Sequence, residues 1–499
     1  MDLRVDSQYQ ISQKEKHSQK RFVSLDFQRG LAIWLMTFLH TFEHLYNYDW
    51  VKKDPQKVLD LPLPILVVGL FVGFFASWNA YFLLISSTVN SLSMTKQARK
   101  GREINQILLK QLLTGVGILA VGYLTDSLLY NGYLGTAIST GDWTNTYPLW
   151  YRFFAMHTLQ IIGWSLIINA IIHSLLMRNK GYEKYRRNMI VYAFLALLVI
   201  SLSPFIHNWV DNMSWLVPQE IPMEVGLGDH SAWPSIHLQA HNASFKTWVM
   251  ALIAGDLEPL FPYLATSFAG SMVGLALAKP KPPKRLPAIG GGISVSLMGF
   301  GGLFLALGFF TMNNNRPALG NYLLMLGGQL GALFFFLWLM EYRGKSKQIA
   351  NRHIVKHFRL WGMASLSIYC LAIFELLPRW FLSSMINLIF SEEVNLLKSS
   401  LFGYGQEYLA ILVAIYVILA FELMVFLWSK FNFKFSFEWF IIHFTSLGTG
   451  SVSQRLNVDL MMNHIHWINI KEILAKDKIS GSIDKSIENE QNSLIEIKK

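Results

Sequence analysis

Cysteine and charge are both scarce in this sequence. The single cysteine, Cys370, lies within an apolar run, so no disulfide can form within one chain. Charged residues make up 15% of the 499 residues, against roughly 25% in typical soluble domains. This shortage argues against a soluble globular protein. A cleavable signal pattern is also missing from the polar first 24 residues, so we expect the first apolar run to be retained.

Long apolar runs are what the sequence has in abundance, and 52% of its residues are hydrophobic. A helix needs about 20 apolar residues to cross the hydrocarbon core, and only helices or closed barrels can cross it. These runs are too long for barrel strands. We therefore predict an all-α, polytopic transmembrane bundle of about ten helices, at residues 26–46, 62–90, 106–126, 149–176, 188–206, 258–278, 289–311, 320–341, 360–378 and 404–428.

The loops between these runs alternate in charge, except that the first loop holds Lys52, Lys53 and Lys57. Basic residues fill the loops near 94–107, 177–187, 279–285 and 343–359, whereas the segment 126–148 has none and the segment 207–257 has only Lys246. The positive-inside rule places the basic loops in the cytoplasm. Both termini then lie in the cytoplasm too. Because the basic residues follow this topology, the sequence pI of about 9.4 does not lead us to expect nucleic acid as a partner.

Four regions follow from these patterns. Residues 1–24 form a polar cytoplasmic N-terminus, and residues 25–430 form the bundle with an outer loop at 207–257. Residues 431–464 are predicted to lie along the inner interface, and 465–499 to form a solvated cytoplasmic tail. The outer loop mixes His, carboxylate and Trp side chains, including His207. That mixture suits a carbohydrate or other polar acceptor, and it equally suits a folded cap over the bundle.

The first predicted helix carries most of the polar groups at membrane depth, where such groups are costly. Asp26 and Arg29 share a face at its inner end. They form either a helix-end pair or part of a phosphate site. His40, Glu43 and His44 share a face at its outer end. They are either solvated side chains of a helix end or catalytic groups, and their H-x-x-E-H pattern also matches an inverted zinc-protease motif. His157 is predicted two turns inside the fourth helix.

The opening signature resembles that of the heparan-alpha-glucosaminide N-acetyltransferase catalytic-domain family, within a wider superfamily of transmembrane acyltransferases. It reads Arg21-Phe-Val-Ser-Leu-Asp26-Phe-Gln-Arg29-Gly30-Leu-Ala-Ile-Trp-Leu-Met36, and Gly30 is followed ten residues later by His40. Further similar motifs come in the family's order and extend the resemblance over about residues 21–440: Leu159-Gln160-Ile-Ile162-Gly163, Asp256-Leu-Glu-Pro259-Leu-Phe-Pro262-Tyr263 with Gly270 and Gly274, Trp361-Gly362-Met363-Ala-Ser365-Leu-Ser-Ile-Tyr369, and Ser436-Phe-Glu438-Trp439.

The resemblance implies an acyltransferase that takes an acyl group from cytoplasmic acyl-CoA and delivers it to an outer-face acceptor. It implies that His44 or His40 is the catalytic base, with Glu43 or Asp49 orienting it. Groups implied at the acyl-CoA are Arg29, Asp26, Arg99 and Gln160, and groups implied at the acceptor are His157, Asp49 and His207.

We therefore predict a multi-pass protein of the cell membrane that moves an acyl group, acetyl by preference, from acetyl-CoA or another acyl-CoA to a glycan, amino sugar or other polar acceptor. No metal cofactor is expected. Membrane lipid and a second copy of the chain are the other expected partners. The alternative, from a different class, is a non-enzymatic or transport-type bundle that keeps the acyltransferase scaffold.

Overall fold

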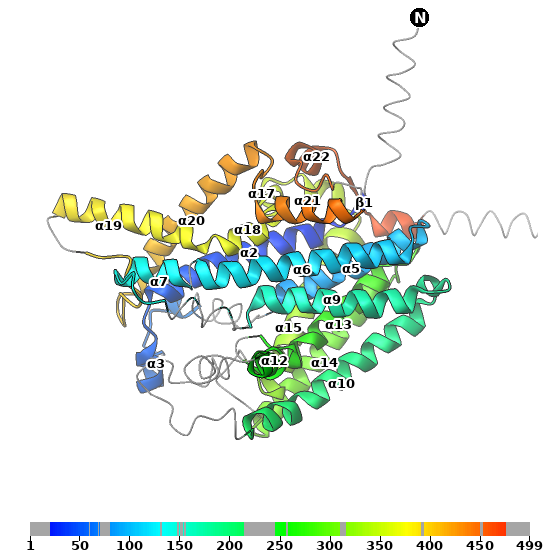
Figure 1. Cartoon of the computed structure of the whole chain (residues 1–499), viewed down its shortest axis with the longest axis horizontal. Coiled ribbons are helices and arrows are strands. Elements are labelled where there is room, and N and C mark those ends of the chain that lie inside the picture. The colour runs from blue at the N-terminus through cyan, green and yellow to red at the C-terminus, as the bar shows by residue number, and fades with distance from the viewer. Residues whose placement is uncertain are drawn as a thin grey trace, which may run out of the picture.

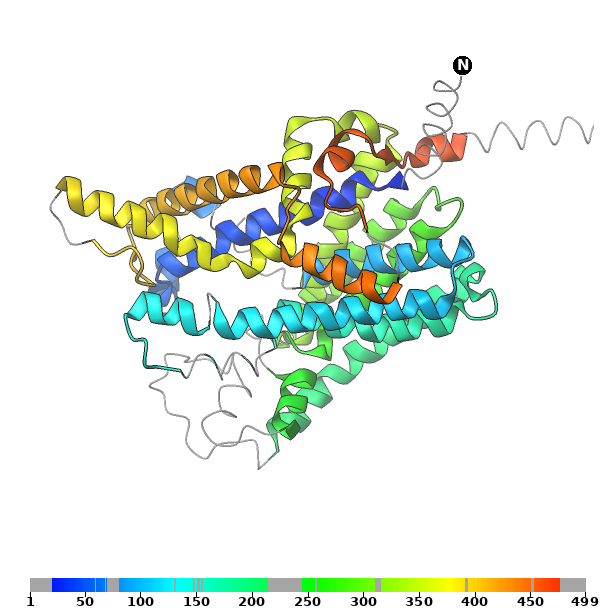
Figure 2. The ribbon, with the colours of Figure 1, turned by 45° about the horizontal axis from the view of Figure 1, so that its top comes forward.

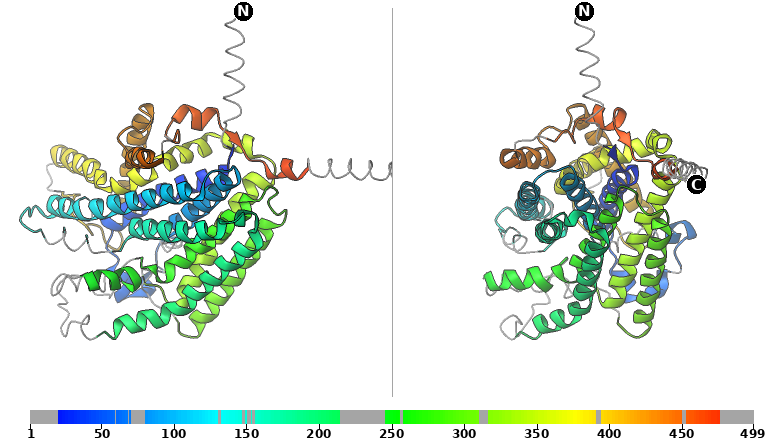
Figure 3. Two further views of the ribbon diagram at one scale, coloured as in Figure 1. Left: turned by 45° about the vertical axis from the view of Figure 1, so that its right-hand side comes forward. Right: turned by 90° about the vertical axis from the view of Figure 1, so that its right-hand side faces the viewer.

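The computed structural model describes residues 20–58, 60–67, 69, 80–129, 132–146, 149, 153, 156–213, 245–255, 258–309, 316–390, 394–449 and 453–475. The fold is all-α, as predicted (Figure 1). Among the described residues, the named strands are the two-residue segments β1 (Lys20–Arg21) and β2 (His466–Trp467), which pair in parallel with Lys20 opposite His466. The first and last described segments of the chain therefore meet on one side of the bundle (Figure 3).

Eight described helices are long and apolar enough to cross a membrane. This finding confirms the class of integral, multi-pass helical bundle. The eight are α6 (Ile104–Leu128), α9 (Thr158–Met177), α10 (Tyr185–Asp211), α13 (Leu260–Ala278), α14 (Leu286–Ala306), α15 (Leu319–Leu337), α19 (Leu376–Phe390) and α20 (Glu407–Lys430). Seven of the eight correspond to predicted helices, whereas the span Ala372–Phe390, which contains α19, overlaps the predicted helix 360–378 only at residues 372–378.

The other two predicted helices are the polar ones. The first is α2 (Val23–Leu45), whereas the prediction 62–90 is wrong as a single helix: the chain turns at Ala80, and α5 (Tyr81–Arg99) begins there and extends into the predicted basic loop. Part of the second prediction, at 68 and 70–79, lies outside the described residues. Helix α2 contacts α5, α15 and α20, and α5 contacts α9 and α13 (Figure 1). Helix α2 carries ionisable groups and α5 many hydroxyl groups. Interior positions allow such groups to find polar partners that lipid cannot supply.

Glycines set the close approach of α2 and α5 to their neighbours. A Cβ at Gly274 of α13 would lie 2.4 Å from the Thr88 carbonyl oxygen on α5. A Cβ at Gly30 of α2 would lie 1.5 Å from the carbonyl oxygen of Phe358, which belongs to α17 (His353–Met363). Both backbones can therefore touch only because these positions lack a side chain.

The ninth predicted helix, at 360–378, is wrong as a single element. The chain forms α17, then α18 (Ser365–Cys370), a 3₁₀ turn η6 (Ala372–Glu375) and α19. The polar groups at this break hydrogen-bond to a residue far away in the sequence. Glu438, at the start of α21 (Phe437–Thr449), accepts the Leu366 N–H at 2.6 Å and the Ser367 hydroxyl at 2.5 Å. A carboxylate thus satisfies N–H groups that an uninterrupted helix would have paired internally.

The remaining elements close the ends of the bundle. Helix α21 packs along α6 (Figure 2), so the segment predicted at the inner interface places the buried Glu438 against α18. The predicted outer loop contains α12 (Phe245–Ala254), and its residues 214–244 and 256–257 lie outside the described residues, as do 1–19 and 476–499. The shorter elements are α3 (Asp49–Lys53), η1 (Pro55–Val58), α7 (Tyr133–Thr140), η2 (Gly181–Glu183), the π-helix η5 (Trp338–Tyr342), α16 (Ser346–Ala350) and α22 (Val458–Asn463).

Candidate functional site

A cavity of about 470 Å³ lies along α2, between it and α15, and we call it the main cavity. Its size falls within the range of about 300–1,000 Å³ that small-molecule sites occupy. The cavity extends along α2 from Gln28 to Glu43. Its middle is apolar, lined by Leu31, Leu35, Leu39, Met298, Phe335 and Phe336.

The end of this cavity nearest the C-terminus of α2 carries two of the predicted catalytic residues. His40 and Glu43 both line it, and His40 Nδ1 lies 3.0 Å from Glu43 Oε2. The pair is three residues apart on α2, so both side chains project from one face of the helix. A carboxylate at Nδ1 holds a proton there and leaves Nε2 as the basic nitrogen of a neutral imidazole. The His40 side chain is 53% exposed, so that nitrogen can be reached.

His44 is one turn further along the helix and does not line the cavity. Its Nδ1 is 3.3 Å from Glu375 Oε2, and Glu375 in turn pairs with the buried Arg379 at 2.5 Å. The rings of His44 and His40 are stacked with centroids 6.1 Å apart. The two predicted base candidates therefore belong to two separate histidine–carboxylate pairs, and only the His40 pair faces the cavity.

A third ionisable group of the cavity, Glu258, was not predicted as a site residue from the sequence. Its side chain is buried at 5% exposure, and its Oε1 accepts the Ala80 N–H at 3.3 Å. Thr158 lines the cavity as well, and the charge of His40 acts on this carboxylate. The signal that could have found it is a carboxylate next to Pro259 at the start of a predicted spanning helix, because such groups are rarely idle.

Four arginines converge at the N-terminal end of α2. Arg21, Arg29, Arg359 and Arg455 line a small cavity of about 20 Å³ together with Asp26, Gly362, Met363, Met461 and Met462. We call this the arginine pocket. Asp26 accepts two hydrogen bonds from Arg21, at 2.6 and 2.9 Å, and Arg29 donates to the Ser365 hydroxyl at 2.7 Å. With four guanidinium groups and one carboxylate, the pocket has an excess of positive charge.

Two of these arginines come from segments far from α2 and were not predicted. Arg359 is on α17 and donates to two backbone carbonyls, those of Ala350 and Met461, yet its Nε has no partner. Arg455 follows α21, and its Nε is buried without a partner as well. Burial lowers the pKa of Arg455 to about 10, so the group stays charged at neutral pH. Unpaired guanidinium N–H groups beside a cavity are suited to an anion.

The other predicted site residues lie away from both cavities in the described chain. Arg99 donates to the Ala278 carbonyl at 2.9 Å and Gln160 to Asp126 at 2.8 Å. His207 donates to the Phe261 carbonyl at 2.8 Å. His157 is the buried N-cap residue of α9, so its predicted position two turns inside a helix is wrong. Asp49 is exposed at the start of α3.

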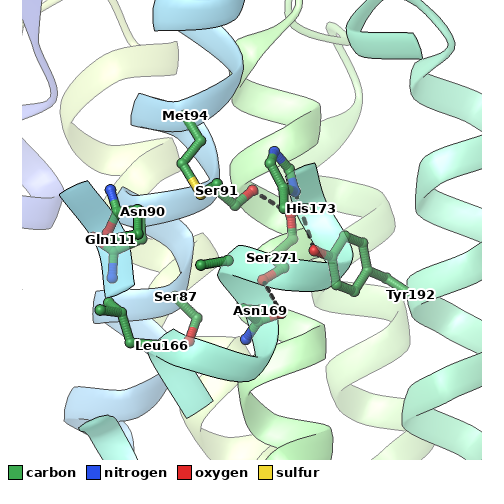
Figure 4. A pocket seen from close by; sticks show the side chains of 11 residues that line it. Ser87, Asn90, Ser91, Met94, Gln111, Leu166, Asn169, His173, Tyr192 and Ser271 are labelled. Atoms are coloured by element: carbon green, nitrogen blue, oxygen red, sulfur yellow. Dashed lines mark hydrogen bonds between the residues drawn. The ribbon is translucent and has the colours of Figure 1, made fainter. Parts of the chain in front are cut away.

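Two further polar clusters were considered as sites. Figure 4 shows the first, in which His173 contacts the Tyr192 hydroxyl at 3.1 Å and the Ser271 hydroxyl donates to Asn169 at 3.2 Å. His173 also contacts the Thr95 hydroxyl at 2.9 Å. Its cavity of about 10 Å³ has room for no more than one water. These groups therefore join the helices to one another.

The second cluster is centred on Glu422 of α20. Its carboxylate accepts the indole N–H of Trp34 at 2.8 Å and that of Trp361 at 3.0 Å, and it pairs with His357 at 3.1 Å. This cluster joins α2, α17 and α20. No described cavity reaches it.

Comparisons with known proteins add no family to these observations. No protein-family model matches the chain, and no curated protein matches it in sequence. Among the described residues, no group of three or more His, Cys, Asp and Glu side chains is arranged to hold a metal ion. The fold and the two cavities therefore define the class: an integral multi-pass membrane protein with a polar site at each end of one interior helix.

Proposed function

We propose that this chain is an acyl-CoA-dependent acyltransferase of the cell membrane, which acylates a glycan, amino sugar or related polar acceptor at its outer face. The observation that carries the proposal is the polarity of α2. Arg29 at the arginine pocket and His40 at the main cavity are on one continuous helix. They are eleven positions apart in the sequence, which is about 16 Å along the axis at 1.5 Å per residue.

The arginine pocket supports the donor side of the proposal. Coenzyme A carries phosphate groups at one end and the thioester at the end of a long pantetheine arm. Phosphates prefer guanidinium donors, and Arg29, Arg359 and Arg455 offer them where two N–H groups lack partners. An extended arm bound at this end would bring the thioester toward the level of His40.

The His40–Glu43 pair supports the chemical step. Nε2 of a neutral His40 removes the proton from the acceptor hydroxyl or amine as its oxygen or nitrogen attacks the thioester carbonyl. The carbon–sulfur bond then breaks, the acyl group stays on the acceptor, and the proton carried by His40 passes to the coenzyme A thiolate. Glu43 keeps the imidazole oriented at Nδ1 and stabilises its charged form.

The proposal is tested on the purified full-length chain in lipid nanodiscs with radiolabelled acetyl-CoA. The expected result is release of free thiol and transfer of label to members of a panel of amino sugars and polyols. The matched comparison is His40→Gln against His443→Gln, since His443 bonds only the Trp439 carbonyl on its own helix among the described hydrogen bonds. Absence of thiol release with acetyl-CoA and with longer acyl-CoA donors would contradict the proposal and favour a transport-type bundle.

A further inference from the structure

Glu258 has one carboxylate oxygen without a partner. Oε1 accepts the Ala80 N–H at 3.3 Å, whereas Oε2 is buried and makes no hydrogen bond. The side chain as a whole is 5% exposed. An unpaired carboxylate oxygen in a protein interior is costly because it has lost its water without a replacement. The unpaired oxygen therefore lowers the stability of the fold, and a bound hydrogen-bond donor would remove this free-energy penalty.

The residue that carries the unpaired oxygen lines the same cavity as the proposed base. Glu258, His40 and Glu43 all line it, and Glu258 and His40 interact electrostatically. These groups come from two separate segments, α2 and the turn before α13. A ligand at this end of the cavity can therefore contact Glu258 and His40 at once.

In the rest of the cavity, the polar groups are already hydrogen-bonded to the protein. Near its middle, the Ser294 hydroxyl already donates to the Gly327 carbonyl at 2.6 Å. At the end nearest the N-terminus of α2, the Tyr81 hydroxyl donates to Gln28 at 2.5 Å. The polar groups that can still form hydrogen bonds are those around Glu258 and His40. A polar acceptor therefore finds most of its hydrogen-bond partners there.

We propose that Oε2 of Glu258 binds the acceptor, by accepting a hydrogen bond from one of its hydroxyl or amine groups while a second such group reacts at His40. This inference rests on the proposed function and narrows its substrate class. The acceptor has at least two hydrogen-bond donor groups on one compact framework, as polyols and amino polyols have. Compounds with a single amine or hydroxyl leave Glu258 unpaired, and sites of this kind discriminate strongly against them.

Two probes of similar ring size test the inference. Glucosamine has an amine and several hydroxyl groups, whereas cyclohexylamine has the amine alone. Binding of each radiolabelled probe to the full-length chain in nanodiscs is measured without any acyl donor. Wild type is expected to bind glucosamine at least ten times more tightly than cyclohexylamine.

The variant Glu258→Gln keeps the size of the side chain and an oxygen for the Ala80 N–H, but its amide nitrogen cannot accept a hydrogen bond. We expect it to bind glucosamine at least ten times more weakly and cyclohexylamine unchanged. Glu407→Gln is the matched control, because Glu407 is also buried but accepts the Tyr46 hydroxyl at 2.6 Å and lines neither cavity. Glu258→Asp, which keeps the charge but shortens the reach, should weaken glucosamine binding too.

Equal glucosamine affinity in wild type and Glu258→Gln, no glucosamine binding by wild type, or equal affinity of wild type for the two probes would each overturn the inference. If Glu258→Gln does not fold, as judged by gel filtration, Glu258→Asp decides on the same criterion. Failure of the proposed function is seen separately, as the absence of thiol release from acetyl-CoA by the same wild-type preparation.

Discussion

His40 and Glu43 are hydrogen-bonded at 3.0 Å one turn apart on α2, and both face the main cavity. His44, one turn beyond His40, instead bonds Glu375 at 3.3 Å outside that cavity. The first prediction follows from this difference. His40→Gln should lower kcat for acetyl transfer by about 100-fold or more, the usual contribution of a general base. Initial rates of thiol release measure it.

His44→Gln is the comparison for that experiment. It removes a partner of Glu375 without touching the cavity, so kcat should fall by less than about tenfold while thermal stability decreases. A loss of activity in His44→Gln that equals the loss in His40→Gln would contradict the assignment of the base.

The arginine pocket gives a second prediction. Arg29→Gln and Arg455→Gln should each raise KM for acetyl-CoA by about tenfold or more, because a hydrogen bond to a charged group is worth about 1.5–3 kcal/mol. Their effect on kcat should be small. Arg99→Gln serves as the control, since Arg99 bonds the Ala278 carbonyl and lies outside the pocket. Steady-state kinetics over a range of acetyl-CoA concentrations separate the two constants, and an unchanged KM in both pocket variants would contradict the prediction.

Glu438 gives a third prediction, on stability. Glu438→Ala leaves the N–H groups of Leu366 and Ser367 and the Ser367 hydroxyl without their carboxylate partner. Each buried group that loses its partner costs about 1–3 kcal/mol, so the unfolding temperature in detergent should fall by several degrees. Glu472→Ala, at an exposed residue, should leave the unfolding temperature within error of wild type. The same unfolding temperature for both variants would show that Glu438 does not cap α18.

The fourth prediction concerns the contact of α2 with α17. Gly30→Ala places a Cβ 1.5 Å from the Phe358 carbonyl oxygen, so the two helices must move apart. Overpacking of this kind costs typically about 1–3 kcal/mol, and activity should fall because α2 carries both sites. At Gly299 of α14 a Cβ meets nothing within 4 Å, and Gly299→Ala should therefore be neutral. Thermal unfolding and thiol release together check the pair of variants, and equal behaviour would contradict the prediction.

The spanning helices were predictable because lipid imposes both their length and their composition. His40 was found for a similar reason, since a polar residue stands out in an apolar run. The break at Ala364 could not be predicted from the local sequence, because its cause is Glu438, more than seventy residues later. A local pattern does not contain the partner that makes an interruption stable.

The candidate site was predictable only in part, for the same reason. Asp26, Arg29, His40 and Glu43 share one helix, so their spacing places them on common faces. Arg359, Arg455 and Glu258 join them from other segments, and no spacing links those segments to α2. His44 differs in another way. It has the residue type and spacing of a base, but its partner is Glu375 and it does not line the cavity.

The pairing of Arg21 with Trp467 has a consequence for biosynthesis. The arginine pocket combines Arg21, near the start of the chain, with Arg455, near its end. A nascent chain that has already inserted all eight of the described apolar helices still lacks Arg455 and the strand that pairs with β1. The arginine pocket thus forms only after residues 455–467 have been synthesised, so on the proposed function shorter nascent chains do not bind the donor.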